Sequence, residues 1–324
     1  MDIPGDTGKI WRLSKFIDYH ALGDADMNFP LLIRYADSHS LSVNNRFWLA
    51  FLYSTCYSVP TTCFLFESIT LHTKRSKIED FWLKNKYKMV FQSDKKYVKN
   101  MDWFITLVED FKLETGKKPY MYFKAFRAQS PQQTYDLLYK TIMKWRFFGR
   151  FTTFLLIEAI HKLTPLKADS DWFDWKNGNT ATSGMMHIMY LDEEAIKFDK
   201  TNIIASDTMS RLVNGLVKLK ERIRMAHPTA SINITDIETA LCGFRKLFKQ
   251  SRYGGYYIDR AQTEIVFMEE LHPDYNNIWG ELWYFRQLSF PHIFLGELNG
   301  HIGIQKHRYK DWTEKGLTGV EAIS

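Results

Sequence analysis

The chain has little cysteine for its length: only Cys56, Cys63 and Cys242 among 324 residues. The three cysteines form no C-x-x-C pair and have no histidine at metal-ligand spacing. A sparse, odd set argues against a disulfide framework and a structural zinc site, and favours a reducing compartment. Hydrophobic residues make up 45% of the chain and aromatic residues 16%, which is enough for a sizeable core.

Nucleotide-binding and export signals are missing as well. Neither G-x-x-x-x-G-K-[ST] nor G-x-G-x-x-G occurs, which argues against a P-loop and a dinucleotide-binding fold. The opening MDIPGDTGKI has neither a charged n-region nor an apolar h-region, so no signal peptide is expected. Residues 47–66 carry no charge over 20 residues, but Pro60 and several hydroxyl side chains favour a buried helix interrupted near Pro60 over a membrane span.

Apolar residues recur at helical spacing along most of the chain, which predicts a mainly α fold. The expected helices are 45–69, 77–87, 95–116, 131–147, 150–163, 208–226, 234–249, 259–271 and 278–285, with a short one starting at Glu193 and Glu194. Strand signals are few, and residues 120–127 alternate only loosely. No repeat or Pro-rich linker divides the chain, so we expect a single helical enzyme unit or two lobes, about 1–200 and 201–324, with a cleft between them.

The excess positive charge is concentrated in one segment. The net charge is +6, and residues 72–100 hold nine Lys or Arg against three Asp or Glu, so this segment accounts for the whole excess. Aromatic residues alternate with the cations, which suits a nucleic-acid groove. We predict polyanion contact there through Lys84, Lys86 and Lys88; the alternative is a solvated helix face with its aromatic rings turned inward.

Residues 130–174 are the most informative stretch. Ser130 can cap a helix N-terminus, Pro131 fits the first turn, and Gln133 completes a capping box. Gly149 interrupts the apolar pattern, and a second helix is expected from about Arg150. Two helices joined by a tight glycine turn leave backbone N–H groups unpaired where the second helix starts.

Cations cluster at this predicted helix start. They are Lys144, Arg146 and Arg150. Unpaired amide groups and positive charge together make a candidate phosphate seat. The alternative is an ordinary αα-hairpin.

A short acidic stretch follows the second helix. It contains Asp169, Asp171 and Asp174. A carboxylate in a partly dry cleft beside phosphates can act as a general base or stabilise a developing cation, whereas turn chemistry is the structural alternative. Trp175 beside them requires either burial or a flat partner such as a base. A phosphate seat followed by carboxylates indicates an enzyme acting on nucleic acid.

A further candidate site surrounds the Gly-Gly pair at 254–255. Its arginines and tyrosines are Arg245, Arg252, Arg260, Tyr256 and Tyr257. The arginines offer forked donors that match phosphate or carboxylate, and the tyrosines can stack on a ligand. A surface turn with tyrosines packed in the core is the alternative.

Several stretches resemble a bacteriophage family. They are NNRFWLAFLYSTCYSVPT, FGRFTTFLLIEAI with DWFDWKNGN, and LCGFRKLFKQSRYGGYYIDR. The family is the α-glutamyl/putrescinyl thymine pyrophosphorylases, or amino acid:DNA transferases, related to helix-hairpin-helix DNA glycosylases. The likeness begins near residue 40 and implies a glycosylase-like helical fold in which Gly149, Arg150 and Thr152 contact the DNA backbone. The chain departs from the hairpin motif where Phe147 or Phe148 replaces the first glycine.

The resemblance also implies a reaction in the cytoplasm of the infected bacterial host. A kinase pyrophosphorylates 5-hydroxymethyl-deoxyuridine in double-stranded phage DNA, and this enzyme flips the base and replaces pyrophosphate with the amine of an amino acid or polyamine. Asp171 or Asp169 would deprotonate the amine or stabilise charge on the pyrimidine. The three arginines would hold pyrophosphate or the amino-acid carboxylate, and Tyr256 and Trp175 would form base-stacking walls.

Two other functions remain open at this point. One is a DNA glycosylase that hydrolyses the N-glycosidic bond, and the other is a basic DNA-binding protein without enzymatic activity. A divalent metal would assist pyrophosphate departure, but no metal-ligand set is legible, so no cofactor is expected. The membrane is not an expected partner.

Overall fold

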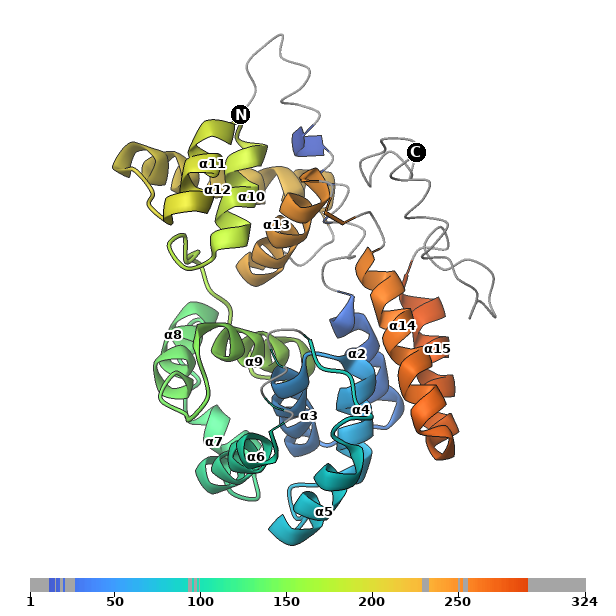
Figure 1. The fold of residues 1–324 in the computed structure, drawn as a ribbon. Helices are drawn as coiled ribbons and strands as arrows, with labels where there is room; N and C mark the ends of the chain where they lie inside the picture. Colours follow the sequence, from blue (N-terminus) through green and yellow to red (C-terminus); the bar gives the residue numbers. More distant parts are fainter. Residues whose placement is uncertain are drawn as a thin grey trace. The chain divides into compact units, whose positions relative to one another are not determined.

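The computed structural model describes residues 12–14, 16–17, 20, 27–92, 95, 98, 100–228, 233–249, 251–252 and 256–290. All regular elements in these ranges are helices, which confirms the predicted mainly α class (Figure 1). None of the helices described is both long enough and apolar enough to cross a membrane.

The described residues divide into two compact units. Unit 1 takes its described residues from 12–27 and 171–259, with Phe290, and unit 2 comprises 28–170 and 260–289. These bounds differ from the predicted lobes, since residue 200 lies inside the helix Asp192–Thr201. The boundary between Ser170 and Asp171 divides the predicted acidic stretch, so Asp169 belongs to unit 2 with the predicted hairpin and Asp171 and Asp174 belong to unit 1.

Unit 2 is built around α3. Its helices are α2 (Asn28–Ser38), α3 (Val43–Cys56), α4 (Val59–Ser68), α5 (Arg75–Asn85), α6 (Met101–Thr115), α7 (Pro119–Lys124), α8 (Pro131–Ile142), α9 (Arg150–Leu163), most of α14 (Tyr256–Leu271), the 3₁₀ turn η3 (Pro273–Tyr275) and α15 (Asn276–Ser289). Every residue of α3 from Phe47 to Cys56 is buried, and α3 packs against α4, α7 and α9. A helix that is apolar all round must be enclosed in this way.

The chain breaks between α3 and α4, as the sequence predicts. Tyr57 has a φ of 53°, in the left-handed region, and Pro60 lies in the first turn of α4. The uncharged run 47–66 is thus two buried helices in the core of unit 2. The predicted interruption near Pro60 is confirmed.

Unit 1 is a smaller bundle centred on α10. Its helices are α10 (Asn179–Ile188), α11 (Asp192–Thr201), α12 (Ser206–Ala226), α13 (Ile234–Phe248) and the first residues of α14. Helix α10 packs on α11, α12 and most extensively on α13. A Cβ at Gly184 would lie 2.3 Å from the carbonyl oxygen of Leu241, so glycine is what allows α10 and α13 to approach so closely.

The loose alternation at residues 120–127 does not mark a strand. Residues 120–127, which alternate like a short strand, form α7 and the turn that follows it. Pro119 occupies the first turn of this helix, and Phe123 stacks on Phe47 of α3 with ring centroids 4.9 Å apart. Packing of a single aromatic face against α3 decides this segment, and a short polar/apolar alternation does not.

A histidine in unit 1 makes the stability of the protein depend on pH. Asp192 accepts hydrogen bonds from Arg12 Nη1 at 2.9 Å and from His187 Nδ1 at 2.7 Å. Burial of the imidazole lowers the pKa of His187 below its ordinary value of 6.5, although the contact with Asp192 opposes this shift. The folded state therefore holds His187 neutral where the unfolded chain already binds a proton.

We expect the free energy of unfolding to fall as the pH drops below about 6.5, because the unfolded state takes up the proton that folded His187 does not. Urea unfolding at a series of pH values measures the slope. His187→Gln should reduce this slope without abolishing it, because burial also lowers the pKa of His272 in unit 2. An unchanged slope in the variant would contradict the assignment.

Candidate functional site

The helix hairpin of unit 2 starts as the sequence predicts. Ser130 Oγ accepts the backbone N–H of Gln133 at 3.2 Å, and Pro131 is the first residue of α8. Helix α8, however, ends at Ile142 and not at Phe147. The following residues form short-range turns, such as the hydrogen bond from Phe148 N to Trp145 O at 3.1 Å.

Aromatic packing is the physical reason for this early end. The indole of Trp145 lies edge-on to Phe111 of α6 and to Phe148, with centroids 6.1 and 5.3 Å apart. A continuous helix would carry these rings onward along its axis, whereas the turn folds them back onto the core. The connection between α8 and α9 is therefore a packed loop and not the predicted tight glycine turn.

The unusual backbone of this loop lies at Phe147. Its φ is 63°, a left-handed conformation that costs a residue with a side chain about 1–2 kcal/mol. The Phe147 ring stacks on the half-exposed Trp103 at 4.5 Å and 11°, which offsets part of this cost. Gly149, by contrast, has an extended φ of −91°, and a Cβ there would meet no atom within 4 Å. The residue in the glycine-like conformation is thus Phe147.

Helix α9 begins as predicted, at Arg150, with Gly149 as a cap residue that offers no side chain to the first-turn amides. Lys144 and Arg146 are exposed on the approach to this end, and Arg146 Nε lies 3.5 Å from Asp110. Uncapped amide groups beside cations retain the features of a phosphate seat. Contact with DNA at this end stays a prediction.

Thr152, the other predicted DNA-binding residue of the hairpin, faces inward. Its hydroxyl accepts a hydrogen bond from Lys95 Nζ at 2.6 Å, and both side chains are buried. The Lys95 ammonium also lies 5.3 Å from the ring centroid of Phe151. Lys95 comes from the basic segment, but it serves the interior of unit 2 and does not extend toward solvent.

The rest of the basic segment combines both alternatives that the sequence leaves open. Lys84 and Lys88 are exposed and Lys86 is half-buried, so these cations remain available to a polyanion. Trp82 is buried and stacks on Phe104, with centroids 3.7 Å apart, as the inward-facing alternative requires.

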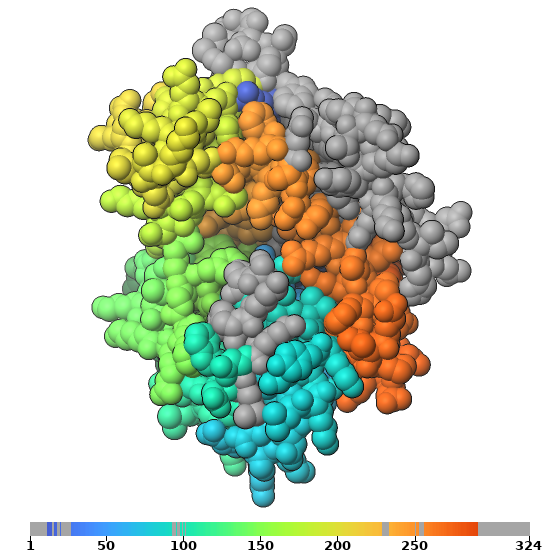
Figure 2. All heavy atoms as spheres, in the orientation of Figure 1, coloured from blue at the N-terminus to red at the C-terminus, as the bar shows by residue number. Residues whose placement is uncertain are grey.

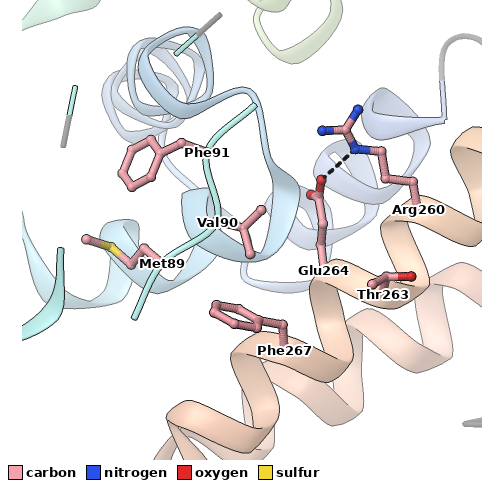
Figure 3. Close-up of a pocket in the computed structure, with 7 residues that line it drawn as sticks. All are labelled: Met89, Val90, Phe91, Arg260, Thr263, Glu264 and Phe267. Carbon is pink, nitrogen blue, oxygen red and sulfur yellow. Dashed lines mark hydrogen bonds and ion pairs between the residues drawn. The ribbon is translucent and has the colours of Figure 1, made fainter. Parts of the chain in front are cut away.

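A cavity of about 350 Å³ opens in unit 2 between the segment 89–91 and α14. Its lining residues are Met89, Val90, Phe91, Arg260, Thr263, Glu264 and Phe267 (Figure 3). The space-filling view shows the two chain segments in contact, α14 in orange and the segment near residue 90 in cyan (Figure 2). The walls are mostly apolar, with a few converging polar groups, as in typical small-molecule sites.

Glu264 is the buried charged group of this cavity, with only 5% of its surface exposed. Its Oε1 accepts hydrogen bonds from Arg260 Nε at 3.2 Å and from Gln92 Nε2 at 2.9 Å. Burial raises the pKa of Glu264, and the charge of Arg260 limits the rise. A carboxyl group with a raised pKa in a cleft is a candidate for proton transfer.

A continuous set of hydrogen bonds joins the cavity to the hairpin. The backbone N–H of Lys95 donates to Gln92 O at 2.8 Å. The Gln92 side chain donates to Glu264 in the cavity, and the Lys95 side chain donates to Thr152 in the hairpin. Sequence reasoning missed Glu264 and Gln92. The available signal was the Arg260–Glu264 spacing of four residues within a predicted helix, which places both side chains on one face.

The three predicted catalytic aspartates have different surroundings. Asp169 is half-buried in unit 2, and its backbone N–H donates to Pro131 O at 3.2 Å, at the start of α8. Asp171 is exposed and lies in unit 1. Asp174, also in unit 1, accepts from the backbone N–H of Asn177 at 3.2 Å and from its side-chain amide at 3.1 Å, which is turn chemistry.

The ring of Trp175 is buried in the core of unit 1 against Phe173, with centroids 4.3 Å apart. Burial therefore meets the requirement of this indole without a stacked base. Trp172 is the exposed aromatic residue of the same stretch, with 43% of its surface accessible.

The residues predicted around the Gly-Gly pair fall into both units, and residues 254–255 lie outside the described ranges. Arg245 of unit 1 donates to Asp199 Oδ2 at 2.8 Å and to Ser183 Oγ at 2.9 Å. An arginine held by two partners in this way has a structural use already. Arg260 is the member of the predicted set that lines the cavity.

The neighbouring pairs of unit 1 are cation–aromatic contacts. The Arg252 guanidinium lies 4.2 Å from the Tyr256 ring centroid, and Lys246 Nζ donates to the Tyr257 hydroxyl at 3.2 Å. These side chains pack against each other and both tyrosines are half-buried, and their contact with substrate stays a prediction.

The cysteines offer no nucleophile in unit 2. Cys56 and Cys63 are fully buried, and burial raises the pKa of Cys56 to about 11. A thiol with so high a pKa stays protonated and unreactive at neutral pH. Within the described ranges, no group of three or more His, Cys, Asp or Glu side chains is arranged to hold a metal ion.

These features define a helical protein with a cationic hairpin and a mostly apolar cavity in the same compact unit. The model of the amino acid:DNA transferase family matches residues 27–253, and the chain belongs to this family. A serinyltransferase of Salmonella phage ViI is 25% identical over 308 residues, which cover 85% of this chain and 71% of that protein. The predicted resemblance is confirmed, and a transferase role in phage DNA modification follows. The family match ends before Arg260 and Glu264.

Phe147→Gly should change the free energy of unfolding by no more than about 1 kcal/mol, because relief of the left-handed backbone offsets the lost stacking on Trp103. Phe148→Ala, at the adjacent buried ring, should cost about 3–5 kcal/mol. Urea unfolding measures both variants. Equal losses would show that Phe147 is held by packing alone and that its conformation carries no appreciable cost.

Gly149→Ala should leave the stability within about 0.5 kcal/mol, because the added methyl group meets no atom and the φ suits any residue. If a DNA phosphate approaches the first-turn amides of α9, the methyl group obstructs it, and we expect affinity for duplex DNA to fall about tenfold. Gly280→Ala on α15, another open glycine, is the matched control and should bind DNA normally. Unchanged binding by Gly149→Ala would exclude a phosphate at this helix end.

Proposed function

We propose that this protein transfers the amine of an amino acid or polyamine to 5-pyrophosphoryloxymethyl-deoxyuridine in phage DNA, releasing pyrophosphate, in the cytoplasm of the infected bacterium. Membership of the amino acid:DNA transferase family supports the reaction class. The leaving group and the modified base are those that the family resemblance implies. Elementary chemistry supports them, because pyrophosphate departs readily and the pyrimidine ring delocalises positive charge at the exocyclic carbon.

The observation that carries this proposal is the set of hydrogen bonds from Thr152 to Glu264. One end lies at the uncapped start of α9, where Lys144 and Arg146 are exposed and DNA phosphates can bind. The other end lies in a cavity that holds a carboxyl and a guanidinium group. An enzyme that joins DNA to a small amine requires both kinds of site, and these two features of unit 2 support the proposal that it has both.

The reaction needs a base as well as binding sites. An amine is protonated at neutral pH, and its ammonium proton must leave before the nitrogen can attack carbon. The nitrogen then bonds to the exocyclic methylene, the carbon–oxygen bond breaks, and pyrophosphate leaves with the electron pair. Asp169 is the first of the predicted carboxylates to test, because its backbone is bonded to the hairpin through Pro131.

The direct test is product analysis. A duplex oligonucleotide carrying 5-pyrophosphoryloxymethyl-deoxyuridine is incubated with the protein and with serine, glycine, glutamate or putrescine, then digested to nucleosides for mass spectrometry. Serine comes first because the phage ViI relative is a serinyltransferase. We expect an aminated 5-methylene nucleoside and one pyrophosphate per product.

The other outcomes separate the alternatives. Release of a free base with an abasic site would identify a glycosylase, and DNA that is bound but unchanged with every amine would identify a binding protein. Oligonucleotides carrying 5-hydroxymethyl-deoxyuridine are the matched control and should remain unmodified, because hydroxide is a poor leaving group. Equal reaction on both DNAs would contradict pyrophosphate displacement.

A further inference from the structure

The lining of the cavity beside α14 includes a positive and a negative side chain, and most of its accessible surface is apolar. Arg260 donates only its Nε to Glu264, and in the described part of the chain its two terminal nitrogens have no hydrogen-bond partner. Figure 3 shows the Nε side of the guanidinium turned toward the carboxyl group and the terminal nitrogens turned away from it. Arg260 is 31% exposed at the side chain, so an incoming ligand can reach these donors.

A free α-amino acid has the complementary pattern, since one carbon carries both a carboxylate and an ammonium group. The terminal nitrogens of a guanidinium group bind a carboxylate in a bidentate manner, and a carboxyl oxygen accepts from an ammonium group. The cavity volume of about 350 Å³ leaves room for a small amino acid. Glu264 is almost entirely buried, which strengthens its interaction with a charged group.

We propose that this cavity is the amino-acid seat of the transferase, with Arg260 binding the α-carboxylate and Glu264 binding the α-ammonium group. The proposal rests on the proposed function. It assigns the binding of an α-amino acid, the substrate class in the family's description, to two named side chains. A diamine such as putrescine has no carboxylate, so Arg260 does not contribute to its binding.

In this proposal Glu264, and not Asp169, supplies the base that the reaction requires. Its carboxylate takes one ammonium proton and becomes neutral, and the amine lone pair attacks the exocyclic methylene while the carbon–oxygen bond breaks. Pyrophosphate leaves with the electron pair, the second nitrogen proton passes to solvent, and Glu264 returns its own proton to solvent. The buried position of Glu264 favours the neutral form, and burial raises its pKa accordingly.

The alternative is an ion pair that only stabilises unit 2, and stability measurements distinguish the two. A carboxyl group whose folded pKa is raised contributes stability below its ordinary pKa of 4.5 and loses it as pH rises through the folded value. Glu264→Gln removes this loss and should be at least as stable as the wild type at neutral pH. A variant that folds equally well but reacts slowly has lost chemistry and not structure.

The test compares serine with ethanolamine, which is the same amine without the carboxylate. Wild-type protein should use serine with a much lower KM than ethanolamine. Arg260→Gln should raise the KM for serine about tenfold to a hundredfold and the KM for ethanolamine much less, because ethanolamine has no carboxylate for Arg260. Loss of the contact with Glu264 should change the kcat for both amines by the same factor. Arg211→Gln, which removes an exposed ion pair with Glu194 in unit 1, is the control and should match the wild type.

Glu264→Gln should lower the kcat about a hundredfold or more and abolish the acid limb of the pH–rate profile. The seat is overturned if Arg260→Gln keeps the wild-type KM for serine, or if the wild type uses ethanolamine as well as serine. The role of Glu264 as base is overturned if Glu264→Gln keeps the kcat and the pH profile. In these cases product formation by the wild type leaves the proposed function standing.

If the wild type forms no product, calorimetric titration with serine tests the seat alone. Binding by the wild type that Arg260→Gln loses would support the seat while the proposed reaction fails. Absence of binding by the wild type, or equal binding by both proteins, would overturn the seat.

Discussion

The constraint on which unit 2 depends is the burial of the Lys95 ammonium group. A charged amine inside a helical core must have hydrogen-bond partners, since leaving it unpaired costs several kcal/mol. Thr152 supplies one partner at the start of α9, and the same short segment holds Glu264 through Gln92. One buried cation therefore ties the position of the hairpin helix to the position of the carboxyl group in the cavity.

Aromatic packing sets the geometry of the hairpin itself. Trp145 and Phe148 fold back onto the core of unit 2, and the chain between them must turn sharply. The left-handed backbone this requires falls on Phe147, whose ring stacks on Trp103. Conformational strain thus lies directly before the uncapped start of α9, a place where functional sites often carry it. Gly149, in contrast, has space for a side chain and an extended φ, so neither crowding nor backbone conformation requires a glycine there.

Local signals predicted much of this fold correctly. Helix α9 has the predicted bounds, Ser130 caps α8, and the chain breaks before Pro60. Such features depend on neighbouring residues only. Helix α10 was missed because its sequence NTATSGMMHI contains many weak helix formers, and the contact with α13 stabilises it. The role of Lys95 was missed because sequence alone does not show whether a cation within a basic segment is solvated or buried.

Sequence by itself determined the helical class, the family and the position of the hairpin, since periodicity, caps and family blocks are written along the chain. It also placed Arg260 at the start of a predicted helix, but Glu264 was missed. Only the tertiary structure decided that residues 89–91 lie beside α14 and that Glu264 and Trp175 are buried. Burial and contact between distant segments depend on how helices pack, and no local pattern specifies which partner each face will meet.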